Sequence, residues 1–181
     1  MSTGYAHNCG VSSSGSVACW GENGAGQSSP PSDTFATVSA GGNHTCGVTT
    51  SGSVECWGRD ESGESSSPSG TFAMVSAGAN HTCGVTASGS VECWGRDGIG
   101  SPPSGTFATV SAGGDHSCGI RTSGSVECWG LDNLGQSSPP SGTFATLSAG
   151  GLHSCGVTTA GTVECWGSGE HGESRPPSGT F

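Results

Sequence analysis

Five times the chain repeats a version of the stretch His44-Thr45-Cys46-Gly47-Val48-Thr49-Thr50-Ser51-Gly52-Ser53-Val54-Glu55-Cys56-Trp57-Gly58. The step between copies is 37 residues, except for one step of 35. A strict period of this size is typical of solenoids, propellers and repeat arrays. The histidine that opens each copy is His7, His44, His81, His116 or His153, and the tryptophan near its end is Trp20, Trp57, Trp94, Trp129 or Trp166.

Each copy is predicted to form a β-hairpin. Residues 50–52 (Thr-Ser-Gly) separate two short runs that are rich in Val, Thr, Cys and Trp. A three-residue connection that ends in glycine suits a type I turn followed by a left-handed residue. If Cys46 lies opposite Cys56, the alternation of side chains along a strand places both cysteines and His44 on one face and Trp57 on the other.

A third strand is predicted before each hairpin, for example at residues 35–41. The small side chains of this segment suit a strand that runs close to its neighbours around a crowded axis. A polar loop that ends in proline follows each hairpin, and no window of the sequence carries the apolar spacing of a helix. We therefore predict an all-β fold, a five-bladed β-propeller of short antiparallel sheets with one 37-residue repeat per blade.

The whole chain, residues 1–181, is expected to form one domain, since the few aromatic side chains are spread evenly over the repeats. Every repeat has one Trp and one Phe in fixed places. A core divided in this way is what stacked blades would produce. The predicted units are approximately 1–33, 34–70, 71–105, 106–142 and 143–181.

The chain ends predict a ring that is closed by the two termini. The last residue, Phe181, is the phenylalanine that opens the third strand of each repeat, and Met1 stands at the position of Val38. Only the counterparts of Ala36 and Thr37 are missing between them. We therefore predict that Phe181 and Met1 lie close together in one blade. The alternative is the same junction between two molecules, with Phe181 of one copy meeting Met1 of the next.

The charge balance excludes several classes of partner. Four basic residues, all arginine, stand against fourteen acidic ones, for a net charge of −10. Nucleic-acid binding depends on neutralising phosphates with Lys and Arg, so we expect no nucleic-acid partner. No apolar run approaches the ~20 residues of a membrane helix, so no membrane insertion is expected. The acidity favours solubility, with attraction of a cationic partner or calcium as the alternative.

The ten cysteines form five equivalent pairs, each with nine residues between its members. Cysteines that face each other across antiparallel strands can meet disulfide geometry with little backbone movement. A structural zinc site wants four protein ligands, whereas each repeat offers one His and two Cys. Disulfides are therefore favoured over a metal site or free thiols, and they indicate an oxidising compartment, extracellular or at the cell surface. The expected pairs are Cys9–Cys19, Cys46–Cys56, Cys83–Cys93, Cys118–Cys128 and Cys155–Cys165.

The pattern at residues 40–48, 51–54 and 56–58 resembles the repeat of the regulator of chromosome condensation family, and residues 130–136 resemble the closing loop of that repeat. The resemblance covers all five units and implies a β-propeller with one repeat per blade. The best-known members have seven blades. The two cysteines per repeat match the bacterial extracellular branch of the family rather than the nuclear one. Nuclear members activate a small GTPase and bind nucleosomes, and the acidic balance here argues against carrying either activity over.

No catalytic residue, cofactor or metal is expected, because nearly every polar group occurs five times. Residues 115–117 (Asp-His-Ser) contain the residue types of a hydrolase triad, but adjacent strand residues alternate faces and cannot form the relay. We predict a secreted, non-catalytic binding or scaffold propeller that recognises a protein or a glycan through variable loops. The alternatives are a structural unit that assembles with itself into an extracellular surface array or filament and, more weakly, an enzyme inhibitor of the propeller type.

Positions that vary among five near-copies mark the expected binding surface. Variation concentrates in the loop after each Trp-Gly and in the pair of residues before each His. Drift in solvated loops is the alternative explanation. The candidate binding residues are Tyr5, Glu22, Asn23, Asn43, Arg59, Asp60, Glu61, Asn80, Arg96, Asp97, Asp115, Leu131, Asp132, Asn133, Leu152, Glu170 and His171.

Overall fold

The computed structural model describes residues 1–181, and its regular secondary structure is entirely β. Five three-stranded antiparallel sheets, one per repeat, form blades 1 to 5 of a propeller, as the sequence predicts. Within each blade the strands are hydrogen-bonded in chain order. The strands are β1 (Ser2–Thr3), β2 (His7–Val11) and β3 (Val17–Gly21) in blade 1; β4 (Phe35–Ala40), β5 (His44–Thr49) and β6 (Val54–Gly58) in blade 2; β7 (Phe72–Ala77), β8 (His81–Thr86) and β9 (Val91–Gly95) in blade 3; β10 (Phe107–Ala112), β11 (His116–Arg121) and β12 (Val126–Gly130) in blade 4; and β13 (Phe144–Ala149), β14 (His153–Thr158) and β15 (Val163–Gly167) in blade 5.

The hairpin of every blade has the predicted register. In blade 2, Cys46 lies directly opposite Cys56, and the same pairing recurs in the other four hairpins. Gly52 closes the turn with a φ of 91°, a left-handed conformation that glycine adopts without strain. The third strand carries a bulge after its phenylalanine, between Phe35 and Thr37. This bulge lets the ring of Phe35 cover Gly47, which has no side chain to obstruct it.

Each blade therefore has two faces of different composition, because successive side chains of a strand point to opposite sides of the sheet. One face carries the histidine and the cystine, and we call it the disulfide face. The other carries the tryptophan, and we call it the tryptophan face. In blade 2 the disulfide face consists of His44, Cys46, Val48, Val54 and Cys56, and the tryptophan face consists of Phe35, Thr45, Gly47, Glu55 and Trp57.

Four apolar clusters fill the spaces between the five blades. Each joins the disulfide face of one blade to the tryptophan face of the next, as where Phe35 and Trp57 of blade 2 pack on Cys9 of blade 1. The ring centroids of Phe35 and Trp57 lie 5.7 Å apart in an edge-to-face arrangement. Aromatic pairs of this geometry add to the stabilisation from buried area. The hydrophobic core thus consists of four separate clusters, each lying between two blades and none lying within a single blade.

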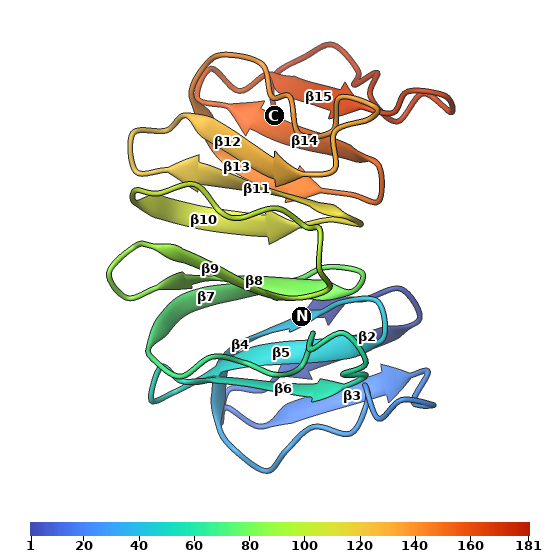
Figure 1. The fold of residues 1–181 in the computed structure, drawn as a ribbon, viewed down its shortest axis with the longest axis vertical. Helices are drawn as coiled ribbons and strands as arrows, with labels where there is room; N and C mark the ends of the chain where they lie inside the picture. Colours follow the sequence, from blue (N-terminus) through green and yellow to red (C-terminus); the bar gives the residue numbers. More distant parts are fainter.

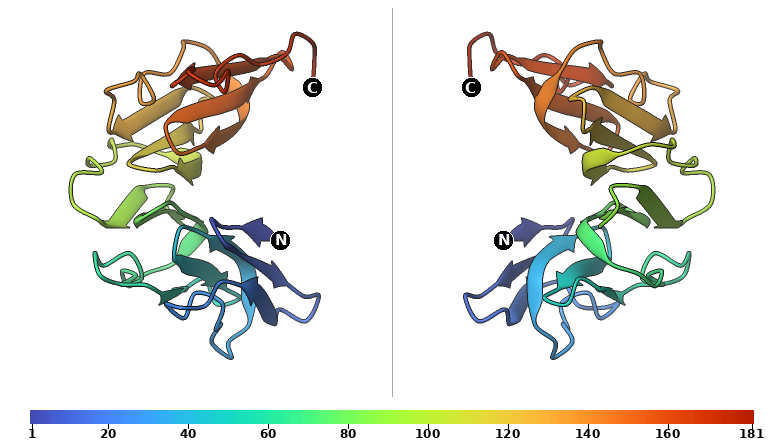
Figure 2. Two further views of the ribbon diagram at one scale, coloured as in Figure 1. Left: turned by 90° about the vertical axis from the view of Figure 1, so that its right-hand side faces the viewer. Right: turned by 90° about the vertical axis from the view of Figure 1, so that its left-hand side faces the viewer.

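The blades follow one another along the molecule in chain order (Figure 1), and the ends of the inner strands line the space at their axis. The blades form an open arc, and the two chain ends lie on opposite sides of the opening (Figure 2). Met1 and Phe181 are 91% and 67% exposed and do not meet, so the predicted closure of the ring by the two termini is not made in this structure. The physical reason is that each interface fixes the turn from one blade to the next, and four such turns leave a gap.

Candidate binding face

Small residues line a funnel of about 400 Å³ at the axis of the arc. Backbone hydrogen bonds join neighbouring blades around it. The N–H of Gly42 donates to the carbonyl of Gly78 in the next blade (2.9 Å), and three further bonds repeat this contact. A side chain on Gly41 would collide with that carbonyl, so glycine is required for this approach. The expectation of small residues at a crowded axis is confirmed.

A rim surrounds the mouth of the funnel, and both sets of variable positions contribute to it. In each blade the first residue after Trp-Gly donates its backbone N–H to the carbonyl of the residue just before the histidine, as from Arg59 to Asn43 (2.9 Å). This bond places the two variable positions side by side. The rim positions are Glu22, Arg59, Arg96, Leu131 and Ser168 after the tryptophans, with Tyr5, Ala6, Asn43, Asn80, Asp115 and Leu152 before the histidines.

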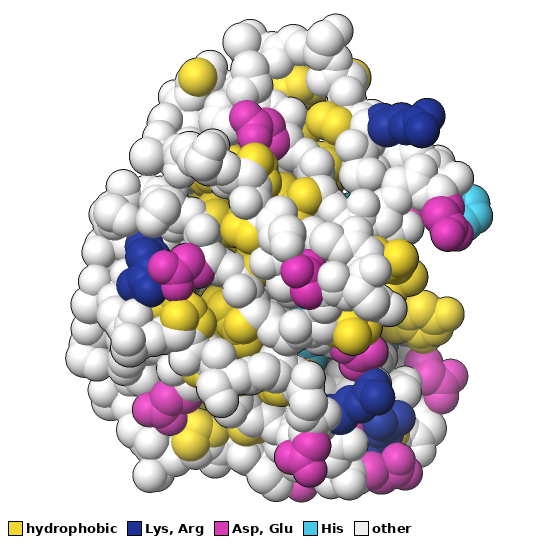
Figure 3. Space-filling view, turned by 45° about the horizontal axis from the view of Figure 1, so that its top comes forward, with side chains coloured by type: hydrophobic (Ala, Val, Ile, Leu, Met, Phe, Trp, Pro, Cys, Tyr) yellow, Lys and Arg dark blue, Asp and Glu magenta, His cyan; other side chains and the backbone are white.

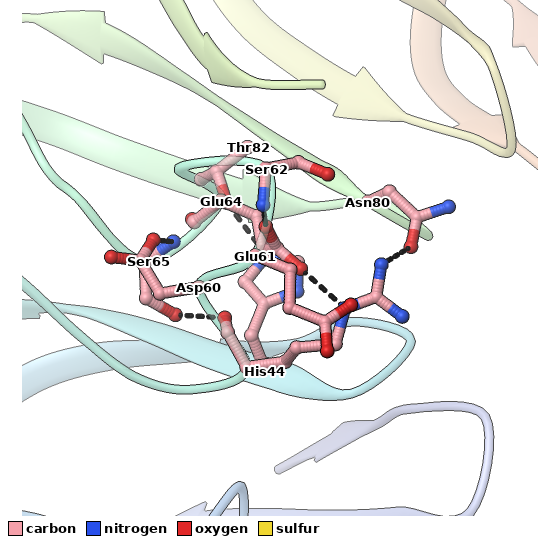
Figure 4. Close-up of polar contacts among 9 residues, drawn as sticks. His44, Asp60, Glu61, Ser62, Glu64, Ser65, Asn80 and Thr82 are labelled. Atoms are coloured by element: carbon pink, nitrogen blue, oxygen red, sulfur yellow. Dashed lines mark hydrogen bonds and ion pairs between the residues drawn. The ribbon is translucent and has the colours of Figure 1, made fainter. Parts of the chain in front are cut away.

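The middle of the rim is polar and connects neighbouring blades. Nη2 of Arg59 donates to Oδ1 of Asn80 at 2.8 Å, and Nη1 of Arg96 forms an ion pair with Oδ1 of Asp115 at 2.6 Å. The Arg59–Asn80 contact is drawn in Figure 4. The structure thus brings together four residues that the sequence marked as candidates, each pair bridging two blades.

The two ends of the rim present apolar side chains to solvent. Leu131 and Leu152 are 37% and 48% exposed and occupy the positions that Arg96 and Asp115 hold one blade earlier. Tyr5, at the other end of the arc, is exposed and lines the funnel. Large apolar and aromatic side chains of this kind are the usual anchors of protein interfaces.

Other candidates hold their own loops together. Side-chain oxygens of Asn23, Asp60 and Asp132 each accept the backbone N–H of a serine five residues further along, at 2.8 to 2.9 Å. Such bonds are the ordinary way in which Asn and Asp stabilise turns. Asn133 accepts a hydrogen bond from the side chain of Gln136 (3.1 Å). Glu61, Asp97, Glu170 and His171 are exposed on these loops, and Glu61 lies 3.6 Å from Arg59.

A buried carboxylate in the loop of blade 2 was not predicted from the sequence. Glu64 is 1% exposed and accepts hydrogen bonds from Nε of Arg59 (2.8 Å) and from the backbone N–H of Ser62 (2.7 Å). Figure 4 shows Glu64 among the residues of this loop, beside His44 and Thr82. Gln27 and Gln136 take the same place in blades 1 and 4, so an acidic residue at that repeat position was the available signal.

The four histidines inside the interfaces are hydrogen-bonded structural groups. Nε2 of His44 lies 2.8 Å from Oγ1 of Thr82 in the next blade, and this hydroxyl donates in turn to the backbone carbonyl of Glu64 (3.1 Å). The hydroxyl has only one proton, so Nε2 must be the donor in their bond. Nδ1 of His44 then carries no proton, and it has no partner.

Burial lowers the pKa of His44 and of His81 to about 4. The pKa values of His7 and His116 are lowered by the same cause. For His44 the nearby Glu64 acts in the opposite direction but does not offset the loss of solvent. These imidazoles are therefore neutral at pH 7.

All ten cysteines are paired in the five predicted disulfides, and none is free. The zinc alternative would need two thiolates in each repeat, and the disulfides remove them. No group of three or more His, Cys, Asp or Glu side chains in residues 1–181 is arranged to hold a metal ion.

Serines of the inner strands form a further bond between blades that sequence reasoning missed. The backbone N–H of Ala77 donates to Oγ of Ser39 in the preceding blade (3.0 Å), and the other three interfaces repeat this bond. The signal was present in the sequence, since every repeat has serine at this position.

The surface carries few basic side chains. The view in Figure 3 shows them as separate groups, most beside acidic side chains, on a largely uncharged surface. No helix of the structure has the length and hydropathy needed to cross a membrane.

Several solved structures share the fold. The ectodomain of the receptor kinase CR4 from Physcomitrella patens superposes with a TM-score of 0.82 at 28% identity, over 98% of this chain and 53% of that one. The CRINKLY WD40 ectodomain of the Arabidopsis thaliana receptor kinase ACR4 gives 0.78 at 29% identity, over 97% and 65%. Prp20p from Saccharomyces cerevisiae gives 0.72 at 17% identity, over 91% of this chain and 57% of that one, which shows a shared fold.

The chain thus spans between about half and two thirds of the length of these structures. No curated protein matches its sequence. The Regulator of chromosome condensation (RCC1) repeat matches at residues 1–27, 35–64, 75–98, 107–136 and 144–173, which together make up most of the chain. The chain belongs to the family of RCC1-repeat β-propellers.

Proposed function

We propose that this chain is an extracellular, non-catalytic binding propeller that recognises a protein through the rim of the funnel. The observation that carries the proposal is the convergence of the two variable sets on one face. The position of Arg59 and Leu131 and the position of Asn43 and Leu152 both vary between repeats, and in this fold the two positions lie side by side around one opening. By contrast, the cysteines and the phenylalanine that recur in the repeats pack between the blades.

The extracellular location rests on chemistry and on similarity. Five disulfides persist most readily in oxidising compartments. The two receptor-kinase ectodomains are 28% and 29% identical to the chain over nearly its whole length. Both observations support a protein that acts outside the cytosol.

A protein partner fits the rim better than a glycan does. The exposed side chains at its ends are a tyrosine and two leucines, Tyr5, Leu131 and Leu152, and the middle offers two hydrogen-bonded arginines. Apolar anchors with arginine and a polar surround are typical of protein interfaces. Of the five tryptophans that a sugar could stack on, four pack between blades and only Trp20 is half exposed.

The test is capture of partners from extracellular material by the folded chain, followed by chemical cross-linking. A triple variant, Tyr5→Ser with Leu131→Ser and Leu152→Ser, is expected to lose the captured protein. A matched control changes Ser14, Ser51 and Ser123 to Ala at the hairpin turns, which lie at the opposite ends of the strands. Loss of capture in the control but not in the rim variant would contradict the proposal. So would binding to a glycan array without any protein captured, or turnover that one substitution abolishes.

A further inference from the structure

The connection that follows blade 3 differs from the other four. It spans residues 96–106, whereas the corresponding connection of blade 1 spans residues 22–34 and is two residues longer. The connections after blades 2, 4 and 5 have the longer form. Blade 3 lies between blades 2 and 4, and apolar clusters cover both of its faces. The difference therefore belongs to the interior of the array.

The longer connections hold themselves together by hydrogen bonds. In blade 1 the N–H of Gly26 donates to the carbonyl of Asn23 (3.1 Å) and the N–H of Ser29 donates to the carbonyl of Gly26 (3.0 Å), and blades 2, 4 and 5 repeat both bonds. Residues 97–103 make no hydrogen bond with any part of the chain. The polar backbone groups of this segment are therefore available to a ligand.

A hollow of about 370 Å³ lies between this connection and strand β9. Cys93, Trp94 and Gly95 form one wall, and residues 96–102 form the rest. A volume of this size is within the range of ligand sites in proteins.

The wall formed by β9 is an unpaired strand edge. The strand order of blade 3 is β7-β8-β9, so β9 pairs with β8 alone. The Cα atoms of Cys83 and Cys93 lie 4.1 Å apart, the close spacing of an opposite pair that is not hydrogen-bonded in an antiparallel ladder. The N–H and C=O of Cys93 therefore point away from β8, toward the outer edge. Because the pattern alternates along the strand, the same holds for Gly95.

The hollow also carries a negative charge that nothing in the chain balances. Arg96 forms an ion pair with Asp115 at 2.6 Å, so its own charge is matched. Asp97 is exposed, lines the hollow and makes no ion pair or hydrogen bond. Glu92, on the same edge strand, is exposed and makes no ion pair either. In a chain of net charge −10, this edge favours a basic partner.

We propose that the outer edge of β9 binds an extended, basic segment of a protein partner, which adds to blade 3 as a further strand. The backbone of the segment pairs with the N–H and C=O of Cys93, and a Lys or Arg side chain of the segment reaches Asp97. Exposed strand edges bind peptides in this way, the main chain giving affinity and the side chains specificity. The site goes beyond the proposed recognition at the rim and does not depend on it.

The first test uses a short fluorescent peptide of alternating lysine and valine, with the folded chain in about 0.15 M salt. Fluorescence anisotropy should show saturable binding, and replacement of the lysines by glutamate should weaken it by at least about tenfold. Two further peptides are N-methylated at every lysine or at every valine. Their affinities should differ by at least about tenfold, because the N–H groups of alternate residues point to opposite edges and only one edge faces β9.

The second test changes the chain. Replacing residues 96–101 by residues 22–29 of blade 1 gives blade 3 the longer connection and should abolish binding. Asp97→Asn should weaken binding by about threefold. Asp33→Asn, the matched control, removes an exposed carboxylate beside the hairpin turns and should leave binding unchanged. Hydrogen exchange locates the contact: the amide of Cys93 should exchange more slowly in the complex, and the amide of Cys56 in blade 2 should not change.

Other outcomes would overturn the proposal. The absence of saturable binding up to millimolar peptide excludes the site. Equal affinities of the two N-methylated peptides contradict backbone pairing, and binding by the variant with the longer connection places the peptide elsewhere. Slower exchange at Cys56 as well as Cys93 would show a general attraction to strand edges. If the exchanged connection prevents folding, Ser101→Lys replaces it, at an exposed position of the hollow. This variant should weaken binding by about tenfold, and unchanged binding would contradict the site.

Discussion

Blades 2 and 5 are built from nearly the same repeat, yet they differ in what covers them. His44 in blade 2 is 0% exposed and bonded to Thr82 of blade 3. His153, at the same repeat position, is half-buried, and no other blade among residues 1–181 packs on it or gives it a hydrogen-bond partner. The repeat therefore does not determine the burial of its own residues. Its neighbour does, and stability in such arrays resides largely in contacts between adjacent units.

The largest expected difference is between two variants, one that lacks a tryptophan inside an interface and one that lacks a tryptophan outside any interface. Trp57→Ala leaves a cavity against Phe35 and Cys9 and should lower the free energy of unfolding by about 3–5 kcal/mol. Trp20→Ala removes a half-exposed side chain and should cost less than about 1 kcal/mol. Urea denaturation at low protein concentration measures both. Equal losses would show that burial does not distinguish the two blades.

Removal of one disulfide should give the next largest difference. Replacing Cys46 and Cys56 by Ser removes a cross-link and places hydroxyls in a covered face, with an expected loss of about 3–4 kcal/mol. The same change at Cys155 and Cys165 removes a cross-link of equal span from the disulfide face of blade 5, which no other blade among residues 1–181 covers, and should cost nearer about 2 kcal/mol. Thermal unfolding under oxidising conditions compares them. If removal of Cys155–Cys165 lowered the stability as much as removal of Cys46–Cys56, this order would be contradicted.

Acid should destabilise the folded chain through its buried histidines. The pKa of His44 and of His81 is about 4 in the folded chain, below the ordinary value of 6.5. Between these values the unfolded chain binds more protons, so stability is full above about pH 6.5 and falls as the pH drops toward 4. Each histidine should contribute a loss of roughly 2–3 kcal/mol.

The measurement is the melting temperature as a function of pH over that window. His44→Gln should have a flatter profile than the unchanged chain, at the cost of lower stability at pH 7. Ser14→Ala, at a hairpin turn and without a titratable group, is the control and should keep the original profile. A His44→Gln profile as steep as the original would exclude His44 as a source of the acid sensitivity.

The smallest difference is expected between two arginines of the rim. Arg59→Ala leaves the buried carboxylate of Glu64 without its cation and should cost about 2 kcal/mol. Arg96→Ala breaks an exposed pair with Asp115 and should cost no more than about 0.5 kcal/mol. Urea denaturation of the two variants measures the difference. Glu64→Gln installs the residue that blades 1 and 4 use, and it should rescue most of the Arg59→Ala loss in a double-mutant cycle. No rescue would show that Arg59 does not act through Glu64.

Local features of the fold could be predicted because each depends on residues within a single repeat. The alternation around Cys46 and Cys56 specifies the hairpin register and its disulfide, and Gly52 marks the turn. The position of Val38 between small residues indicates an inner strand near the axis. Each of these inferences uses residues a few positions apart, where strand geometry alone fixes the outcome.

The closure of the ring could not be predicted in the same way. Alignment of the repeats assigns Phe181 and Met1 to the same strand. The distance between them in space depends on the angle by which each blade is rotated relative to the blade before it. That angle is set by how rings such as Phe35 and Trp57 fit between two sheets, which no repeat period records. The buried Glu64 was missed for a different reason, because its burial depends on how its own loop folds around it, with Arg59 and the backbone N–H of Ser62 donating to its carboxylate.

The funnel lining has a consequence for how such a molecule changes over generations. Each interface joins the same two surfaces, and the bond from Gly42 to Gly78 recurs from blade to blade with different partners. Recombination that inserts or deletes one 37-residue unit in the interior would therefore leave every remaining interface of the same kind. The length of the arc can change in whole steps, while the surface that any one blade offers at the rim changes by point substitution. The number of blades and the surface of the rim are thus separate heritable variables in this architecture.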